Sequence, residues 1–369
     1  MRNTVLRTST ARLIALAFGL ATLGPAGCDP AEFADGEVAL RPGTGLGGTT
    51  FNTSNWVSAS ARDVYEFDRT GAARTNTFGF ETRLKRVIFQ DPQLGQVATD
   101  PASAVNPAIP RVEVAAGTNL AVTVTPPNQN SKTYEGAQLV GLQLLFSVKY
   151  AGSASYDVKL KIASHRYDAV GGNLYGFAKI NPGNSVAIGD LCETSTIGDR
   201  DARVYGNVSV DAFTGAVVEP ANIFHIACTA GAPGKSSTYG YLPTGSAATF
   251  RLVNRVIRAD YCADGYPYTY PGNSLLIRDN FSPGQQGQTL AQVEAYAAAN
   301  AAVVEAVWDE NGVLCVGTPR VDTLDRTDII CPVKRLGVSS SAYNWQPPSC
   351  TGFVDPSPQS TRIYSLTAI

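Results

Sequence analysis

The segment Arg255–Asn273, RVIRADYCADGYPYTYPGN, places a cysteine among acids, arginines and tyrosines. Its Cys262 could be a nucleophile, a metal ligand or half of a disulfide. A nucleophilic thiolate needs a base, a cation or a helix N-terminus that lowers the pKa of the thiol. If the segment is a strand, Arg258, Asp260 and Cys262 share one face, because side chains alternate. The carboxylate of Asp260 would then raise the thiol pKa, which weakens the nucleophile hypothesis.

Metal ligation by Cys262 is also weakly supported. The chain has two histidines and no C-x-x-C pair, which disfavours zinc. In a strand, His225 and Cys228 would face opposite sides. Calcium would use loop carboxylates, but the acidic segments 198–201 and 322–328 lack the spacing of an EF-hand loop. We therefore expect no metal and no other cofactor.

The N-terminus has the features of an export signal. Residues 1–27 contain three arginines and an apolar run over residues 13–23 that is too short to span a bilayer, as in a signal peptide. The small residues that end in Cys28 resemble a bacterial lipobox, which predicts lipidation of that cysteine. Residues 28–48 would form the lipidated N-terminus and a flexible tether. We expect attachment to the bacterial cell envelope, at the outer membrane or cell surface rather than the inner membrane, with free secretion as the alternative.

Export also bears on the other six cysteines. An even number of cysteines in an exported chain predicts disulfides, here three. The residues are Cys192, Cys228, Cys262, Cys315, Cys331 and Cys350. Their connectivity stays open; the most local pairing is Cys192 with Cys228, Cys262 with Cys315, and Cys331 with Cys350.

The elements that carry these residues predict a mainly β fold, with β-sandwich-like or mixed antiparallel sheets stapled by disulfides. Residues 49–180 are rich in strand signals. Residues 139–150 and 156–162 form a predicted hairpin around a turn. In its second strand Val158, Leu160 and Ile162 alternate with lysines, which predicts one buried and one wet face.

Residues 181–335 form a second, cysteine-rich region. Strands are expected over 203–210, 222–228 and 250–262. One long helix is expected near 289–310, because Thr289 and Gln292 form a capping-box pattern and apolar residues recur every three or four positions. We predict that Asn311-Gly312 ends this helix.

The last region, residues 336–369, is a Ser/Pro-rich tail that Cys350 would hold to the rest of the chain. Two arrangements of the chain remain open. A boundary near residue 180 would divide it into two domains, and the alternative is a single domain over residues 49–335.

Three segments resemble the ADYC domain family: FHIACTAGAPGKSSTYGYLP, RVIRADYCADGY and EAVWDENGVLCVGTPR. The likeness extends over about residues 45–335. It implies a bacterial protein of a largely myxobacterial family whose members are functionally uncharacterised and are often predicted lipoproteins. Ser236 stands where the family usually has a cysteine, and Cys350 could replace it. The resemblance implies an exported, disulfide-containing fold and no known activity.

If the motif of this family is structural, its polar residues need partners. Arg258 and Asp260 would form a buried bidentate pair, because leaving either charge alone is costly. Tyr261, on the opposite face, would pack against another layer. Cys262 would then be a disulfide partner.

Tyrosines are the main candidates for a ligand platform. Tyr266, Tyr268 and Tyr270 alternate with two prolines and a threonine. Proline favours an extended backbone, so the three rings are expected to project from one side. Tyr239 and Tyr241 form a second alternating pair. Rows of aromatic rings suit glycans or peptides, and the alternative is simple packing of the loop on the core.

Composition narrows the function further. Removal of the predicted signal peptide, with its three arginines and no acid, changes the net charge from −2 to −5, which argues against a nucleic-acid partner. No common hydrolase or kinase motif is present. We expect a non-enzymatic binding or structural module, with the membrane as partner through the lipid and a glycan or a protein as ligand. The alternative is a carboxylate-based hydrolase that acts on a polysaccharide or peptide polymer of the envelope.

Overall fold

The computed structural model describes residues 56–115, 119–170, 172–195, 199–212, 215–270, 273–282, 285–331, 345–354 and 361–368. The predicted signal peptide, Cys28 and the tether lie outside the described residues. The mainly β fold is confirmed, and all pairings between the named strands are antiparallel. None of the described helices is long and apolar enough to cross a membrane.

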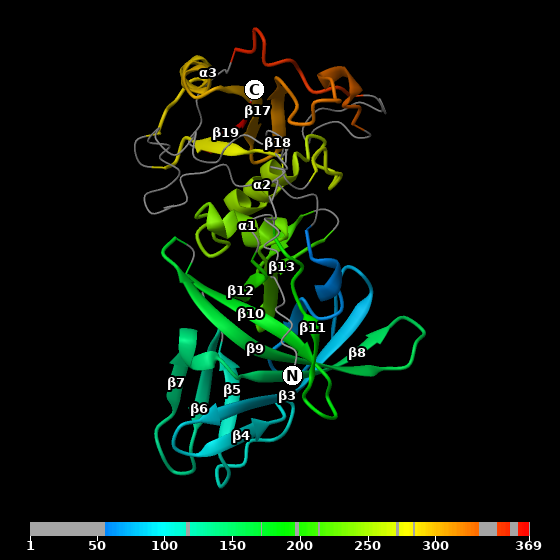
Figure 1. Ribbon diagram of the computed structural model, residues 1–369, viewed down its shortest axis with the longest axis vertical. Coiled ribbons are helices and arrows are strands. Elements are labelled where there is room, and N and C mark those ends of the chain that lie inside the picture. The colour runs from blue at the N-terminus through cyan, green and yellow to red at the C-terminus, as the bar shows by residue number, and fades with distance from the viewer. Residues whose placement is uncertain are drawn as a thin grey trace, which may run out of the picture.

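A ten-stranded sheet makes up the lower part of the molecule (Figure 1). Its main path runs β1-β15-β12-β10-β9-β8-β3-β2, with β11 paired to β10 and β4 paired to β3. The strands are β1 (Glu66–Asp68), β2 (Arg74–Thr75), β3 (Phe80–Asp91), β4 (Gly95–Thr99), β8 (Gln143–Tyr150), β9 (Tyr156–Asp168), β10 (Gly172–Ile180), β11 (Ala187–Asp190), β12 (Asp201–Gly206) and β15 (Ile223–Cys228). Because β1 also contacts β2 and β3, the sheet curls toward a barrel. It contains strands from both sides of residue 180.

The predicted hairpin is the centre of this sheet. β8 pairs with β9 from Gln143 opposite Lys161 to Val148 opposite Tyr156. Apolar residues of β9 point into the core as expected, and Lys161 is exposed. Lys159 differs from the prediction of a wet face, because it is 9% exposed and its Nζ donates a hydrogen bond to Ser185 Oγ at 3.2 Å.

Smaller elements complete the lower part of the molecule. A three-stranded sheet consists of β5 (Arg111–Ala115), β6 (Ala121–Thr125) and β7 (Lys132–Glu135), and a two-stranded sheet of β13 (Ser209–Val210) and β14 (Val217–Val218). Short 3-10 turns lie at η2 (Ala59–Ala61) and η3 (Gly136–Leu139).

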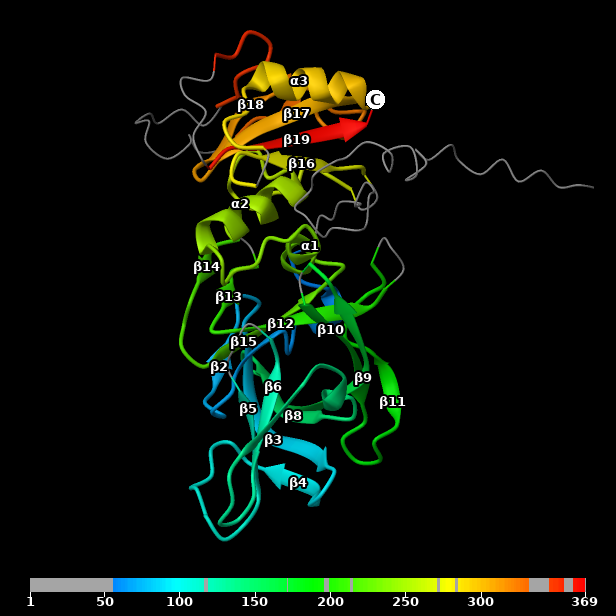
Figure 2. The same cartoon turned by 90° about the vertical axis from the view of Figure 1, so that its left-hand side faces the viewer.

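The upper part of the molecule is a four-stranded sheet with helices on both faces. The sheet order is β16 (Leu276–Asp279), β19 (Ile363–Ala368), β17 (Ala302–Asp309) and β18 (Gly312–Val316). Helix α3 (Leu290–Ala299) lies on one face and α2 (Ala247–Arg258) on the other (Figure 2). α1 (Ala232–Thr238) contacts α2 and β15, so the two helices connect the sheets. A 3-10 turn, η4 (Arg326–Asp328), follows β18.

The long helix predicted near 289–310 is only half correct. Its N-terminus is confirmed, because Thr289 and Gln292 form the capping box of α3. The helix ends at Ala299, Ala301 has a φ of 48°, and the rest is strand β17. β17 is covered on both faces and is almost entirely buried, so its apolar residues need not alternate and can also match a helical spacing.

The strand predicted over 250–262 is wrong, because most of it is helix α2. Ser246 caps this helix by accepting a hydrogen bond from the backbone N–H of Thr249 at 3.2 Å. The buried residues Phe250, Val253 and Val256 recur every three positions, which is a helical spacing. β-branched residues in the segment suggested a strand, and the packing of α2 between two sheets decides the outcome.

The predicted Ser/Pro-rich tail contains a strand, β19, that its composition did not indicate. β19 lies inside the four-stranded sheet and pairs with both β16 and β17. Its side chains from Ile363 to Thr367 are buried. The C-terminal strand therefore belongs to the core of the upper part.

Three disulfides are present, and their pairing differs in part from the most local one. The expected Cys192–Cys228 bridge forms, with an S–S distance of 2.02 Å. The other bridges are Cys262–Cys331 and Cys315–Cys350. The backbone N–H of Cys350 donates to Val316 O at 3.1 Å, so residues around 350 run along β18 and bring Cys350 to Cys315.

One large hydrophobic core extends through both parts of the molecule. It includes residues of the large sheet, both helices α1 and α2, and β17, from Trp56 to Ile363. A smaller cluster lies between α3 and the four-stranded sheet. The two parts are thus joined by continuous packing.

Candidate functional site

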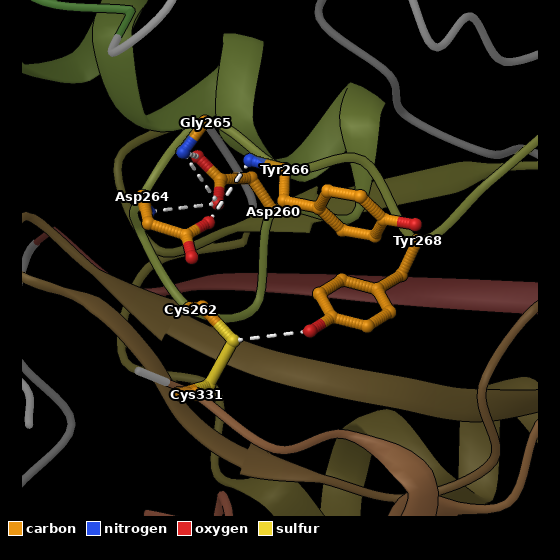
Figure 3. The surroundings of a disulfide bond; sticks show 7 residues. All are labelled: Asp260, Cys262, Asp264, Gly265, Tyr266, Tyr268 and Cys331. Carbon is orange, nitrogen blue, oxygen red and sulfur yellow. Dashed lines mark hydrogen bonds between the residues drawn. A yellow bond between two sulfur atoms is a disulfide. The ribbon is translucent and has the colours of Figure 1, made fainter. Parts of the chain in front are cut away.

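The Arg-Ala-Asp-Tyr-Cys motif forms the C-terminal end of α2 and the loop that follows it, and Figure 3 shows its Asp260 and Cys262. α2 ends at Arg258, and Ala259 takes a left-handed conformation with a φ of 51°. Asp260 is fully buried, and its carboxylate accepts hydrogen bonds from the backbone N–H groups of Asp264 (3.1 Å) and Gly265 (3.1 and 3.2 Å). This carboxylate therefore closes the loop in the way that an Asx turn does.

Two arginines surround this carboxylate. Arg255 Nε lies 3.9 Å from Asp260 Oδ2. Arg258 Nη2 donates to Gly265 O at 2.7 Å, and its guanidinium lies 4.4 Å from the ring centroid of Trp56. The expected bidentate Arg258–Asp260 geometry is replaced by this arrangement, because the turn at Ala259 takes the two side chains off a common strand face.

Burial dominates the electrostatics of the loop. It raises the pKa of Asp260 to about 6, although Arg255 and Arg258 act in the opposite direction. Burial also lowers the pKa of Arg258 to about 10. The desolvation of the Asp260 carboxylate is therefore opposed mainly by the two arginines and less by the hydrogen bond from Gly265, and burial still prevails.

Tyr261 lies between α2 and the upper sheet, as predicted for a side chain that packs on another layer. It is 1% exposed and its ring stacks on Trp308 with a centroid distance of 5.6 Å. Its hydroxyl donates to Glu305 Oε1 at 2.6 Å. Burial, followed by the charge of Glu305, raises the pKa of Tyr261 well above its usual value.

Glu305 is also bound to Arg320, and both side chains are fully buried. Arg320 Nε donates to Glu305 Oε1 at 2.7 Å, and Arg320 Nη2 lies 2.6 Å from Oε2 as an ion-pair contact without hydrogen-bond geometry. Arg320 Nη1 and Nη2 also donate to the carbonyls of Ile257 (3.1 Å) and Val256 (2.8 Å). Arg320 thus donates to two backbone carbonyls in the last turn of α2 and holds this turn against β17.

Sequence reasoning missed Glu305 and Arg320. Glu305 falls within the long helix predicted near 289–310, whereas it lies in the buried strand β17. A single acid inside an apolar run was the available signal for a buried ion pair. Arg320 carried no local signal, because its partners are up to 64 positions away.

The disulfide state of Cys262 answers the question that its sequence context raised. Its sulfur is bonded to Cys331, so neither is a thiolate in this structure. The hydroxyl of Tyr268 lies 3.4 Å from Cys262 Sγ (Figure 3). Among the residues that the structure describes, no group of three or more His, Cys, Asp and Glu side chains is arranged to hold a metal ion.

The structure divides the predicted tyrosine platform. Tyr266 and Tyr270 are 62% and 65% exposed. Tyr268 turns inward and packs on Tyr261 with a centroid distance of 5.5 Å. The three rings therefore do not form one exposed row. Tyr266 meets the ring of Tyr268 edge-on at 5.1 Å.

The second predicted pair is not exposed. Tyr239 and Tyr241 are each 3% exposed. Tyr239 donates a hydrogen bond to Leu275 O at 3.3 Å, and Tyr241 donates to the carboxylate of Asp279. Tyr241 forms part of the wall of a cavity of about 530 Å³ beside the N-terminus of α2, with Phe281 in edge contact.

The fold and this motif define a class: a disulfide-braced, mainly antiparallel β protein in which the Arg-Ala-Asp-Tyr-Cys motif joins a helix to a second sheet. The ADYC domain model matches residues 136–322, and the chain belongs to this family. The match starts at η3, before the cysteine-rich region, and includes the motif, Glu305 and Arg320. Comparison with curated proteins and with solved structures found no match.

Proposed function

We propose that this protein is a non-enzymatic binding or structural module of the bacterial cell envelope, held there by a lipid on Cys28. The observation that carries the proposal is the chemical state of the ADYC motif. Cys262 is oxidised in a disulfide, and the polar groups of Asp260 and Tyr261 bind other groups of the same chain. Such an arrangement supports a brace between sheets rather than a reactive centre.

Two further features support location outside the cytoplasm. The leader has the order of basic, apolar and small residues that export signals share. Three disulfides among the described residues suit an oxidising compartment, because cytosolic thiols are kept reduced. A lipidated Cys28 that carries more than one acyl chain would attach stably to a membrane, whereas a single acyl chain binds only weakly.

The exposed pair Tyr266 and Tyr270 supports a binding role for the motif loop. The loop is held from inside by Asp260, so both rings would be presented on a fixed backbone. Rigid, half-apolar rings contribute contact area at a low entropic cost. We propose a glycan or a protein as the ligand of this loop.

The hydrolase alternative has less support. A paired-carboxylate mechanism needs two acids that converge on a substrate. The cavity beside Tyr241 has no carboxylate in its lining, and the pockets that contain Asp100 and Asp63 have one each. Glu305 is buried against Arg320. None of these four pockets, in the part of the chain that the structure describes, brings two carboxylates together.

Intact mass of the exported full chain, with and without reduction and after thiol alkylation, tests the proposal. We expect a lipid adduct on Cys28 and no alkylated thiol before reduction. Cell fractionation with Cys28→Ala is the companion test, in which the wild type should be in the membrane fraction and the variant released. An unmodified Cys28, or alkylation of Cys262 without reduction, would contradict the proposal.

A further inference from the structure

A second pocket, separate from the ADYC motif, opens where the inner face of the large sheet ends. Its volume is about 480 Å³, within the range of about 300–1,000 Å³ that is usual for small-molecule sites. Four aromatic side chains and an ion pair line it: Phe78, Phe80, Tyr150, Tyr156, Asp63 and Lys179. Ligand sites are frequent at the mouths of barrel-like sheets, and this sheet curls toward a barrel.

The aromatic rings reach the pocket from neighbouring strands. Phe80 on β3 is paired with Tyr150 on β8, and their ring centroids are 5.0 Å apart. Tyr150 and Tyr156 are 49% and 44% exposed, which leaves much of both rings open to a ligand. Also in the lining, the guanidinium of Arg62 lies 5.0 Å from the ring centroid of Phe78. The pocket therefore offers flat apolar faces at its rim.

A charged pair lies among these rings. Lys179 Nζ donates to Asp63 Oδ1 at 3.0 Å and to Oδ2 at 3.3 Å. Their side chains are 20% and 15% exposed, so the pair is partly withdrawn from water but still reachable. The pKa of Tyr156 is raised, by burial and then by the charge of Asp63. A strong donor and a strong acceptor are thus adjacent in the pocket.

The wall formed by residues 59–63 is fixed to the sheet. Ser60 Oγ donates to Leu191 O at 2.6 Å, and the backbone N–H of Ala59 donates to Glu193 Oε1 at 3.1 Å. Thr82 Oγ1 donates to Asp63 O at 2.7 Å. These contacts hold the pocket open before a ligand arrives, which reduces the entropic cost of binding.

We infer that this pocket binds a neutral saccharide. A sugar ring has an apolar C–H face that stacks on an aromatic ring, and hydroxyls at its edge that each donate and accept hydrogen bonds. Neighbouring hydroxyls match the ammonium of Lys179 and the carboxylate of Asp63 at the same time. A charged ligand fits less well, because it would compete for one partner and leave the other partly buried without its counter-ion.

The inference rests on the proposed binding role but uses a site other than the Tyr266–Tyr270 loop. The test is titration of the full exported chain with neutral hexose and N-acetylhexosamine oligosaccharides, and with carboxylated and sulfated forms of the same sugars. Tyr150→Ala removes one stacking face, and Lys179→Met removes the donor. Tyr167→Ala is the matched control, because Tyr167 lies on the same strand as Tyr156, is 68% exposed and does not line the pocket.

We expect saturable binding of a neutral sugar by the wild type. Tyr150→Ala should weaken it by about three- to tenfold, the fold-change that corresponds to one aromatic contact. Lys179→Met should weaken it by more than about tenfold, because it also leaves Asp63 unpaired. Tyr167→Ala should bind as the wild type does, and thermal melts should show that all variants are folded.

Three outcomes would overturn the inference. One is the absence of binding of every neutral sugar up to about 1 mM. Another is a preference of the pocket for the carboxylated or sulfated forms. The third is loss of binding in Tyr266→Ala with no effect of Tyr150→Ala, which would leave the proposed binding role intact and refute this pocket as the site.

Discussion

Replacement of Arg320 by methionine tests whether the buried network is the link between α2 and the upper sheet. Methionine keeps most of the apolar volume of the arginine side chain and lacks its guanidinium. Glu305 then remains fully buried without its counter-ion. It keeps the hydrogen bond from the Tyr261 hydroxyl at 2.6 Å. The carbonyl of Ile257 also loses its side-chain donor, whereas that of Val256 keeps the backbone N–H of Ala259 at 3.1 Å.

The expected loss of unfolding free energy follows from these contacts. Removal of one partner of a buried ion pair costs about 3–5 kcal/mol, because the other charge stays in the interior uncompensated. The Ile257 carbonyl, left without its donor, adds about 1–3 kcal/mol if water does not reach it. These costs are not additive, so we expect a loss of at least about 3 kcal/mol.

Urea unfolding of the disulfide-intact protein measures this loss. Tryptophan fluorescence is a suitable signal, because Trp308 stacks on Tyr261 inside the network. With a slope of about 3 kcal/mol/M, the midpoint should fall by about 1 M or more. The matched control is Arg86→Met at an exposed position of β3, with an expected change within about 0.5 kcal/mol.

A triple variant separates the charge effect from a packing effect. Tyr261→Phe, Glu305→Leu and Arg320→Met together replace the whole network by apolar groups, and such replacements are often close to neutral. We expect the triple variant to be more stable than Arg320→Met alone. A single variant within about 1 kcal/mol of the wild type, or a triple variant less stable than the single, would refute the reasoning.

Three further predictions concern other parts of the core. Tyr261→Phe alone should cost about 1.5–3 kcal/mol in urea unfolding, because it removes a hydrogen bond to a charged acceptor, and a cost below about 0.5 kcal/mol would count against that bond. Burial lowers the pKa of His225 from 6.5 to about 3, and neither ring nitrogen has a hydrogen-bond partner among the residues that the structure describes. Below pH 6.5 the unfolded state therefore takes up a proton on this side chain and the folded state does not. Relative to His225→Phe, the unfolding free energy should fall by about 1.4 kcal/mol for each pH unit from 6.5 down to about 3. Parallel pH profiles of the two proteins would contradict this. Replacement of both Cys315 and Cys350 by alanine opens a bridge of sequence separation 35 and should lower thermal stability by the equivalent of about 3–4 kcal/mol, whereas an unchanged melting temperature would show that the bridge adds nothing.

Local sequence patterns predicted the elements whose contacts are local. The β8–β9 hairpin follows from its alternation and its short turn, and its register agrees with the burial of Val158, Leu160 and Ile162. The start of α3 follows from its capping box at Thr289. In both, the signal extends over a few neighbouring residues, so the sequence alone contains it.

The errors occur where tertiary packing determines the conformation. β17 is buried on both faces and has no alternating pattern, so it was merged with α3 into one helix. α2 contains β-branched residues that favour a strand. It is nevertheless a helix, because its apolar residues are buried between the two sheets. β19 was not predicted, because the serines and prolines before it indicated a loose tail.

The candidate site shows the same division. Cys262 is a disulfide half, as expected, and Asp260 and Tyr261 are buried, but the bidentate Arg258–Asp260 pair is not formed. The partners of the motif were not predictable, because Glu305 is 44 positions from Tyr261, and Cys331 is 69 positions from Cys262. The saccharide pocket was likewise invisible, since its rings come from β3, β8, β9 and the segment before β3.

The sequence by itself determined the periodicities, the helix caps, the number of cysteines available for bridges and the leader pattern, because each depends on residues close together in the chain. Tertiary structure alone decided which cysteines pair, that Glu305 and Arg320 meet Tyr261, and that Tyr266 and Tyr270 are exposed while Tyr239 and Tyr241 are buried. The physical reason is that burial and ion pairing depend on groups brought together from distant segments. Local propensity constrains the backbone of each segment but does not select its neighbours in space.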